Sequence, residues 1–202
     1  MAEKRRMNGA QRRVLIVDAA RTLLAERPYD DVSIADIAAE AGVTRTVVYD
    51  HFPSKKDLVL SFLADEVTAL VAVLSERISG STGTPRDRMA AVLDAHFEFL
   101  HTRPLAFRIL ALDSLADPEI AEVGLQLSQT ADQALGAALA GDLASAGFTA
   151  DSPLLEAKLV LLTSAIRGVS TWWLNHPEVS RREIVDTTTE WLWHGISGLA
   201  CG

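Results

Sequence analysis

The sequence of 202 residues contains a single cysteine, Cys201, so a disulfide within the chain and a cysteine-rich zinc site are both excluded. This cysteine usage is typical of a reducing compartment. The chain also lacks any uninterrupted apolar run of about eighteen residues, the minimum typical of a membrane span. Its basic start, MAEKRRMNGAQRR, is not followed by the apolar segment of a signal peptide. We therefore expect a soluble, cytoplasmic protein with no membrane partner.

Sequence motifs of catalysis are absent as well. The chain has no HExxH, P-loop or GxSxG pattern. Glu98 and His101 supply one Glu-x-x-His, but a di-iron helical bundle needs a second one. Three further histidines (His96, His176 and His194) form no recognisable ligand set. We expect no enzyme activity, no cofactor and no metal site; a helical metalloenzyme is the remaining alternative and would have to contain stoichiometric metal.

The distribution of charge differs between two parts of the chain. The formal net charge is −8, yet the first 60 residues hold ten Lys or Arg against nine Asp or Glu. The remaining 142 residues hold nine against eighteen. Such an asymmetry indicates that the two parts do different work, although a solvated basic tail on an acidic protein explains the charge equally well.

Apolar residues recur mostly at spacings of three and four, and no alternating strand pattern lasts long, which predicts an all-α fold. Prolines and glycines mark the breaks between helices, with SGSTGTP (residues 79–85) the clearest loop. The expected helices are Gln11–Arg27, Ile34–Ala41, Arg45–His51, Lys55–Ile78, Arg86–His101, Leu105–Leu115, Glu119–Ala146, Leu154–Asn175 and Arg181–Leu199.

The second and third of these helices are short and are joined by a glycine turn. Ser33 and Thr44 are suitable N-caps, and Gly42 suits the position that ends the first of the pair. Two short helices joined in this way form a helix-turn-helix, whose second helix enters the major groove of DNA.

Hydrogen-bonding side chains gather on this second helix, as DNA binding requires. Arg45 can donate two hydrogen bonds to a guanine, whereas hydroxyls and ammonium groups suit phosphate oxygens. Single members of the cluster have ordinary explanations, since Ser33 is first a helix cap and Tyr49 could belong to the core. The predicted DNA contacts are Ser33, Thr44, Arg45, Thr46, Tyr49, His51 and Lys55.

The segment VLIVDAARTLLAERPYDDVSIADIAAEAGVTRTVVYDHFPSKKDL (residues 14–58) resembles the DNA-binding domain of the TetR/AcrR-type bacterial repressors. The matching positions are Ala19, Ala20, Leu24, Tyr29, Ile37, Ala38, Ala41, Gly42, Val43, Tyr49, His51, Phe52 and Lys55. Pro28 stands where glycine is usual in the family, and Thr46 where a small residue is common, so base preference cannot be copied from relatives.

The resemblance implies a homodimer with an N-terminal helix-turn-helix domain, residues 1–54, and a C-terminal helical domain, residues 55–202, for effector binding and dimerisation. The two apolar faces of the last helix exceed what one subunit core needs, which favours pairing across a two-fold axis over a monomer. The predicted dimer contacts are Leu155, Leu159, Leu162, Ile166, Ile184, Thr188, Trp191, Leu192 and Gly195.

An aromatic-rich stretch with scattered polar groups, residues 96–110, is the best candidate for an effector pocket, because small-molecule sites are mostly apolar with a few placed polar groups. The candidate residues are His96, Phe99, Phe107, Gln126, Gln129 and Trp173, each of which also fits ordinary core or surface. Together these patterns predict a homodimeric repressor that a small apolar or amphipathic effector releases from double-stranded operator DNA. The alternative is a DNA-binding dimer without an effector, controlled by a protein partner or constitutive.

Overall fold

The computed structural model describes residues 7–111, 118–145 and 153–199. This part of the chain is helical apart from turns and short connections, which confirms the all-α prediction. Its elements are α1 (Gly9–Glu26), the 3₁₀ turn η1 (Tyr29–Asp31), α2 (Ile34–Glu40), α3 (Arg45–His51), α4 (Lys55–Gly80), α5 (Pro85–Thr102), α6 (Pro104–Ala111), α7 (Pro118–Ser145), α8 (Pro153–Leu174) and α9 (Arg181–Leu199).

The predicted helix ends agree with the described ends to within two residues, because proline, glycine and capping residues mark them in the sequence. Two details differ. The turn η1 was not predicted, and α4 runs on through Gly80 into the stretch predicted as a loop. The last residues of the predicted helix Leu105–Leu115 lie outside the described residues.

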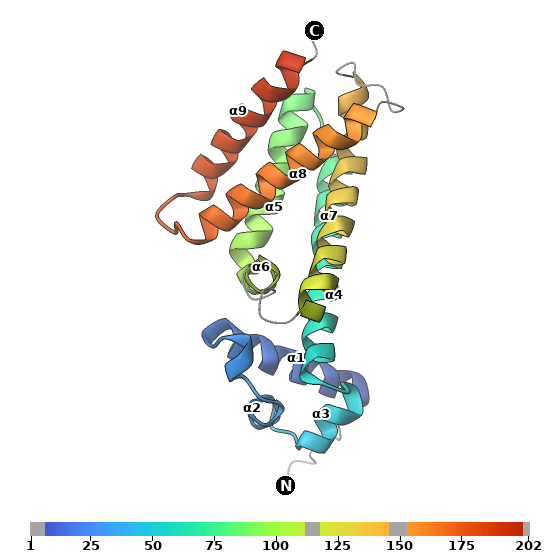
Figure 1. Cartoon of the computed structure of the whole chain (residues 1–202), viewed down its shortest axis with the longest axis vertical. Helices are drawn as coiled ribbons and strands as arrows, with labels where there is room; N and C mark the ends of the chain where they lie inside the picture. The colour runs from blue at the N-terminus through green and yellow to red at the C-terminus, as the bar shows by residue number, and fades with distance from the viewer. Residues whose placement is uncertain (1–6, 112–117, 146–152, 200–202) are drawn as a thin grey trace.

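The first three helices pack together at one end of the molecule (Figure 1). We call α1, α2 and α3 the head. Their contact is apolar, with Ile16, Ile37 and Val48 fully buried between them. Burial of such side chains stabilises a fold by about 1.5–3 kcal/mol each, so a few of them fix how these short helices pack together.

The helix α4 connects the head to the rest of the chain, which we call the core bundle (Figure 1). Leu58, Phe62 and Leu63, near its start, are buried with the head, whereas Leu74 is buried with the core bundle. By length and composition alone α4 could cross a membrane. It packs instead against α5 and α7 within this fold.

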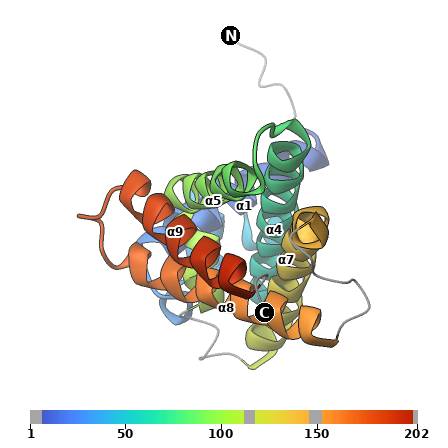
Figure 2. The same cartoon turned by 90° about the horizontal axis from the view of Figure 1, so that it is seen from above.

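The core bundle consists of α5 to α9 and the later turns of α4. Viewed from above, α5 and α9 lie on one side and α4 and α7 on the other, while α8 runs along the lower part of the view from the first side toward the second (Figure 2). Its apolar centre includes Phe97, Leu100 and Trp173, with Phe97 and Trp173 in edge-to-face contact at 5.4 Å between ring centroids. The head's apolar cluster also reaches into α6, through Ala106 and Ile109.

Candidate nucleic-acid interface and effector cavity

The start of α2 is fixed by a reciprocal cap. The Ser33 backbone N–H donates to Asp36 Oδ2 over 2.9 Å, and the Asp36 backbone N–H donates to Ser33 Oγ over 3.2 Å. Hydrogen bonds from Ser33 hold the pKa of Asp36 below its ordinary value. Ser33 itself is exposed, so its hydroxyl stands at the surface at the positive end of the helix.

Gly42 forms the turn between α2 and α3. Its φ is +65°, a left-handed conformation that side chains disfavour, and no other residue in the described part of the chain except Gly83 has a positive φ. The turn lets the Val43 N–H donate to the Ala38 carbonyl over 2.9 Å. The helix-turn-helix is therefore closed by backbone hydrogen bonds and a glycine, as the sequence indicated.

Most of the predicted DNA-contacting side chains at α3 are exposed. Thr44, Arg45 and Thr46 are exposed at the N-terminal end of the helix, and Tyr49 keeps 53% of its surface accessible although aromatic residues are usually buried. Thr44 caps the helix by accepting from the Val47 N–H over 3.3 Å. The opposite face packs Val48 into the head, so the polar face is free to meet a groove.

Lys55 has a structural role that the sequence did not predict. Its ammonium donates to the backbone carbonyls of Tyr29 and Val32 over 2.8 and 2.9 Å and lies 3.8 Å from the centroid of the Tyr29 ring. The ammonium thus ties α4 to η1. His51 is half-buried, beside the start of α1 at Gly9.

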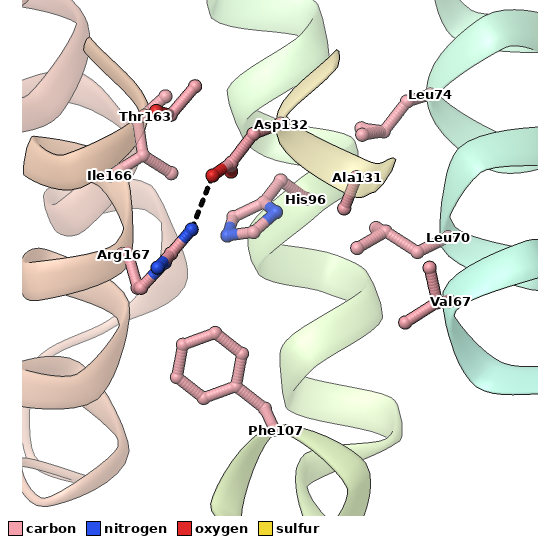
Figure 3. A pocket seen from close by; sticks show the side chains of 10 residues that line it. All are labelled: Val67, Leu70, Leu74, His96, Phe107, Ala131, Asp132, Thr163, Ile166 and Arg167. Atoms are coloured by element: carbon pink, nitrogen blue, oxygen red, sulfur yellow. Dashed lines mark hydrogen bonds and ion pairs between the residues drawn. The ribbon is translucent and has the colours of Figure 1, made fainter. Parts of the chain in front are cut away.

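The core bundle contains a cavity of about 90 Å³ between α4, α5, α6, α7 and α8 (Figure 3). The residues that line it are Val67, Leu70, Leu74, His96, Phe107, Ala131, Asp132, Thr163, Ile166 and Arg167. The lining is apolar apart from His96, Thr163 and the ion pair between Asp132 and Arg167, which bridges α7 and α8. This composition, apolar walls with a few convergent polar groups, is that of a small-molecule site.

His96 is the polar group nearest the middle of this cavity (Figure 3). Its Nε2 lies 2.9 Å from Ser170 Oγ on α8. Burial lowers the pKa of His96 to about 4, because the charged ring would lose its hydration. The imidazole is therefore neutral at pH 7 and can exchange hydrogen bonds with an uncharged polar group of a ligand.

The structure divides the six predicted pocket residues. His96 and Phe107 line the cavity, but Gln126 and Gln129 are exposed on α7, which contributes Ala131 and Asp132 instead. The Trp173 indole belongs to the apolar centre and donates to the Val179 carbonyl over 2.8 Å. The Phe99 ring lies beneath the Arg103 guanidinium, with 5.3 Å between the guanidinium carbon and the ring centroid. The sequence reasoning missed Asp132 and Arg167, although a charged residue inside the apolar pattern of α8 was a usable signal.

The predicted dimer residues also fall into two groups. Five of them, Leu162, Ile166, Ile184, Thr188 and Leu192, are buried within the single chain. Trp191 and Gly195 are exposed, Leu159 is half-buried, and the Leu155 side chain lies outside the described residues. Large exposed apolar side chains do occur on α8 and α9, beside the buried faces of these helices, at Val160, Leu161, Trp172 and Trp191.

Residues 16–62 match the family model of bacterial regulatory proteins, tetR family. The transcriptional activator FasR of Mycolicibacterium smegmatis is 25% identical to this chain over 188 residues, which cover 93% of this chain and 84% of FasR. These matches support a TetR-type regulator. The family prediction is thereby confirmed, and with it a DNA-binding transcription regulator rather than an enzyme.

Other TetR-type relatives match mainly through the N-terminal part. The fatty acid metabolism regulator protein of Bacillus subtilis is 29% identical over 85 residues, 42% of this chain and 43% of that protein. The regulator BetI of Brucella anthropi is 36% identical over 86 residues, 43% of this chain and 44% of BetI. The chain thus matches less than half the length of these two relatives.

Solved structures share the whole fold at low identity. The fatty acid degradation regulator FadR of Bacillus halodurans superposes with a TM-score of 0.77 at 17% identity, covering 90% of this chain and 94% of FadR. FadR of Bacillus subtilis, solved with stearoyl-CoA, gives 0.75 at 20% identity, covering 89% and 96%. These likenesses establish the fold, an N-terminal helix-turn-helix with a helical C-terminal part, and nothing finer.

Proposed function

We propose that this TetR-type regulator is a homodimeric repressor whose α3 helices read operator DNA and whose core cavity binds the effector that releases it. The observation that carries the proposal is the row of exposed polar side chains on α3, from Thr44 to Tyr49, on the side of the helix opposite the buried Val48. Arg45 is the proposed base-reading residue, and Ser33, Thr44 and Tyr49 the proposed phosphate contacts. The proposed domain boundary stays near residue 54, and the proposed location is the cytoplasm.

The exposed apolar side chains of α8 and α9 support the dimer. Leu161 keeps 70% and Trp191 71% of its surface accessible, and Trp172, stacked on His176 with 4.0 Å between ring centroids, adds a further apolar surface. Exposed apolar patches of this kind mark interaction surfaces. Pairing α8 and α9 with their copies across a two-fold axis would bury them in a four-helix contact.

For the effector we propose a long-chain fatty acyl compound. Two relatives are named for fatty acid metabolism or degradation, and one similar structure contains stearoyl-CoA. The cavity suits such a chain in polarity, since only His96, Thr163 and the Asp132–Arg167 pair interrupt its apolar walls. Its volume, about 90 Å³, is below the roughly 300 Å³ of a typical ligand site, so binding requires the helices to move apart.

This requirement gives the mechanism of release. A ligand that separates the walls of the cavity displaces α4, whose first turn is tied to η1 of the head through Lys55. The two heads would then no longer match successive turns of the operator, which lie about 34 Å apart. For an almost complete switch, the effector must prefer the released form by about 5.5 kcal/mol.

One comparison favours a second direction of control. FasR is named an activator, so a regulator of this fold can also promote transcription when bound. A third possibility, a dimer that binds DNA without any effector, predicts that the cavity never opens.

The experiment is a fluorescence anisotropy titration of the purified protein against its own upstream intergenic DNA, with a shuffled duplex of equal composition as control. Sequence-specific binding that weakens on adding stearoyl-CoA, and not coenzyme A alone, is the expected result. Binding that strengthens on adding stearoyl-CoA indicates the activating direction. Equal affinity for both duplexes would contradict the proposal, and specific binding that ignores the acyl compound would remove this effector from it.

A further inference from the structure

A carboxylate and two guanidinium groups meet where the head contacts the core bundle. Glu66 of α4 is 7% exposed, and its two oxygens face different helices. Oε1 lies 2.7 Å from Arg21 Nη2 of α1, and Oε2 lies 3.1 Å from Arg103 Nη1, at the junction of α5 and α6. Each guanidinium also lies over an aromatic ring, Arg21 over Phe62 and Arg103 over Phe99.

The bridge lies beside an open cleft between the head and the α5–α6 corner, next to the apolar contact that Ala106 and Ile109 of α6 make with the head. The same residues line a cleft of about 410 Å³ between α1 and the corner where α5 meets α6. A cleft of this size leaves the head and the corner room to move relative to one another. In this cleft, both Arg21 and Arg103 pair with Glu66, so the position of Glu66 fixes the positions of both guanidinium groups.

Both ends of the bridge are also close in sequence to the effector cavity. Val67, the residue after Glu66, lines the cavity from α4, and Phe107, four residues after Arg103, lines it from α6. A ligand that pushes Val67 and Phe107 apart must therefore change the distance between Glu66 and Arg103. The bridge thus connects α1 of the head to two places near the cavity wall, Glu66 on α4 and Arg103 before α6.

We infer that Glu66 is the residue through which the state of the core cavity is transmitted to the head, by an Arg103–Glu66–Arg21 bridge. The Arg21 half holds α1 to α4, and the Arg103 half fastens that unit to the α5–α6 corner. The transmission deepens the proposed function and rests on it, but the mechanical link can be measured without any ligand.

The test uses the full-length protein with Arg103→Gln, which leaves Glu66 paired with Arg21 and therefore does not leave a buried carboxylate without a partner. Arg77→Gln is the matched control, because Arg77 also joins α4 to a carboxylate of α5, Glu98 at 3.9 Å, but far from the head. Glu66→Gln, which keeps the shape of the side chain and removes the negative charge that both arginines share, is the second variant. Circular dichroism verifies that each variant is folded.

The first measurement is hydrogen–deuterium exchange of the backbone amides of α1 and α6 in the free protein. We expect Arg103→Gln to speed exchange there about two- to fivefold, the range of a half-exposed ion pair, and Glu66→Gln to speed it more. Arg77→Gln leaves exchange in α1 unchanged. Equal exchange in α1 for wild type and Arg103→Gln, or an equal increase in the Arg77 control, would overturn the inference.

The second measurement is the ratio of operator affinities without and with stearoyl-CoA. In the wild type this ratio tests the proposed function alone. If stearoyl-CoA does not change the operator affinity of the wild type, the proposed function fails, and the hydrogen–deuterium exchange result alone decides whether the bridge holds the head. Where the wild type responds, Arg103→Gln is expected to reduce the ratio about fivefold while Arg77→Gln keeps it. A full wild-type response in Arg103→Gln would show that the cavity acts on the head by another route.

Discussion

The head and the core bundle present their functional side chains in opposite directions. In the head, Arg45 and Tyr49 point outward. The helices that carry them are held in place by the N-caps Ser33 and Thr44 and by the turn at Gly42. In the core bundle, His96 and Phe107 point inward, toward a cavity that exists only because five helices pack around it. The head is therefore shaped by bonds between residues close in sequence, and the cavity by contacts between residues far apart.

This difference predicts where each region is sensitive to mutation. An outward-facing residue of α3 can change without cost to the fold and alter only DNA binding. An inward-facing residue of the cavity changes stability and ligand response together. The following predictions separate the two regions, from the largest expected effect to the smallest.

Leu161→Glu on α8 is expected to abolish the dimer, because it places a charge in the proposed apolar contact between subunits. Since operator affinity depends on two linked heads, it should fall by about 10²-fold or more. Sedimentation velocity and operator titration measure the two effects. Leu125→Glu is the matched control, since Leu125 is also an exposed leucine but lies on α7, and this variant should remain dimeric. A dimeric Leu161→Glu variant would place the subunit contact elsewhere.

Arg45→Ala is expected to weaken binding to the operator by about 1–3 kcal/mol while leaving affinity for shuffled DNA nearly unchanged. The side chain is exposed, so thermal stability should stay at the wild-type value. Arg182→Ala, at an exposed arginine of α9, controls for the lost charge. Loss of affinity for both duplexes to the same extent would assign Arg45 to phosphate rather than to a base.

His96→Gln is expected to remove part of the acid sensitivity of the core bundle. The folded pKa of His96, about 4, lies below its ordinary value of 6.5, so the unfolded chain binds more protons between these limits. The contribution of neutral His96 to the free energy of unfolding is therefore fully present above pH 6.5 and is lost as the pH drops toward 4. The loss is on the order of 1–2 kcal/mol between pH 7 and pH 5.

Urea unfolding at pH 7 and pH 5 measures this difference. The His96→Gln variant, which can keep a hydrogen bond to Ser170, should lose less stability over the same interval. Asp36, Asp87 and Glu183, whose lowered pKa values add acid sensitivity below pH 4.5, act equally in both proteins. The same decrease in the variant and the wild type would show that His96 does not titrate in this way.

Gly42→Ala is expected to destabilise the head by about 1 kcal/mol, since the backbone must keep a φ of +65°. Nothing lies within 4 Å of the added methyl group, so the cost is purely conformational. Gly80→Ala, which also meets nothing and lies in the last turn of α4, should be neutral or slightly stabilising. Thermal melts of both variants give the comparison, and equal melting temperatures would contradict it.

The same contrast explains what the sequence could predict. Ser33, Gly42 and Thr44 act on neighbours within a few residues, so their roles in helix α2, the turn and helix α3 follow from local pattern. Lys55 shows the limit, because its bonds to Tyr29 and Val32 depend on how α4 meets η1, which no local pattern contains.

In the core bundle, the limit is the rotation of each helix. The apolar pattern of α8 and α9 predicts two faces correctly, but not which one turns inward. Leu162 and Ile166, which were predicted as dimer contacts, are therefore buried in the subunit, whereas the exposed Leu161 was not among the predicted contacts. The ion pair between Asp132 and Arg167 joins positions 35 residues apart, and only the packing of α7 on α8 brings them together.

The most direct test of the account is a hydroxyl-radical footprint of the full-length protein on its upstream intergenic DNA. Two outward-facing α3 helices on a dimer predict two protected segments on one face of the duplex, centred about one helical turn or a multiple of it apart, with protection lost on adding stearoyl-CoA. A single protected segment, or protection spread evenly along the duplex, would contradict the paired, sequence-reading heads from which the rest follows.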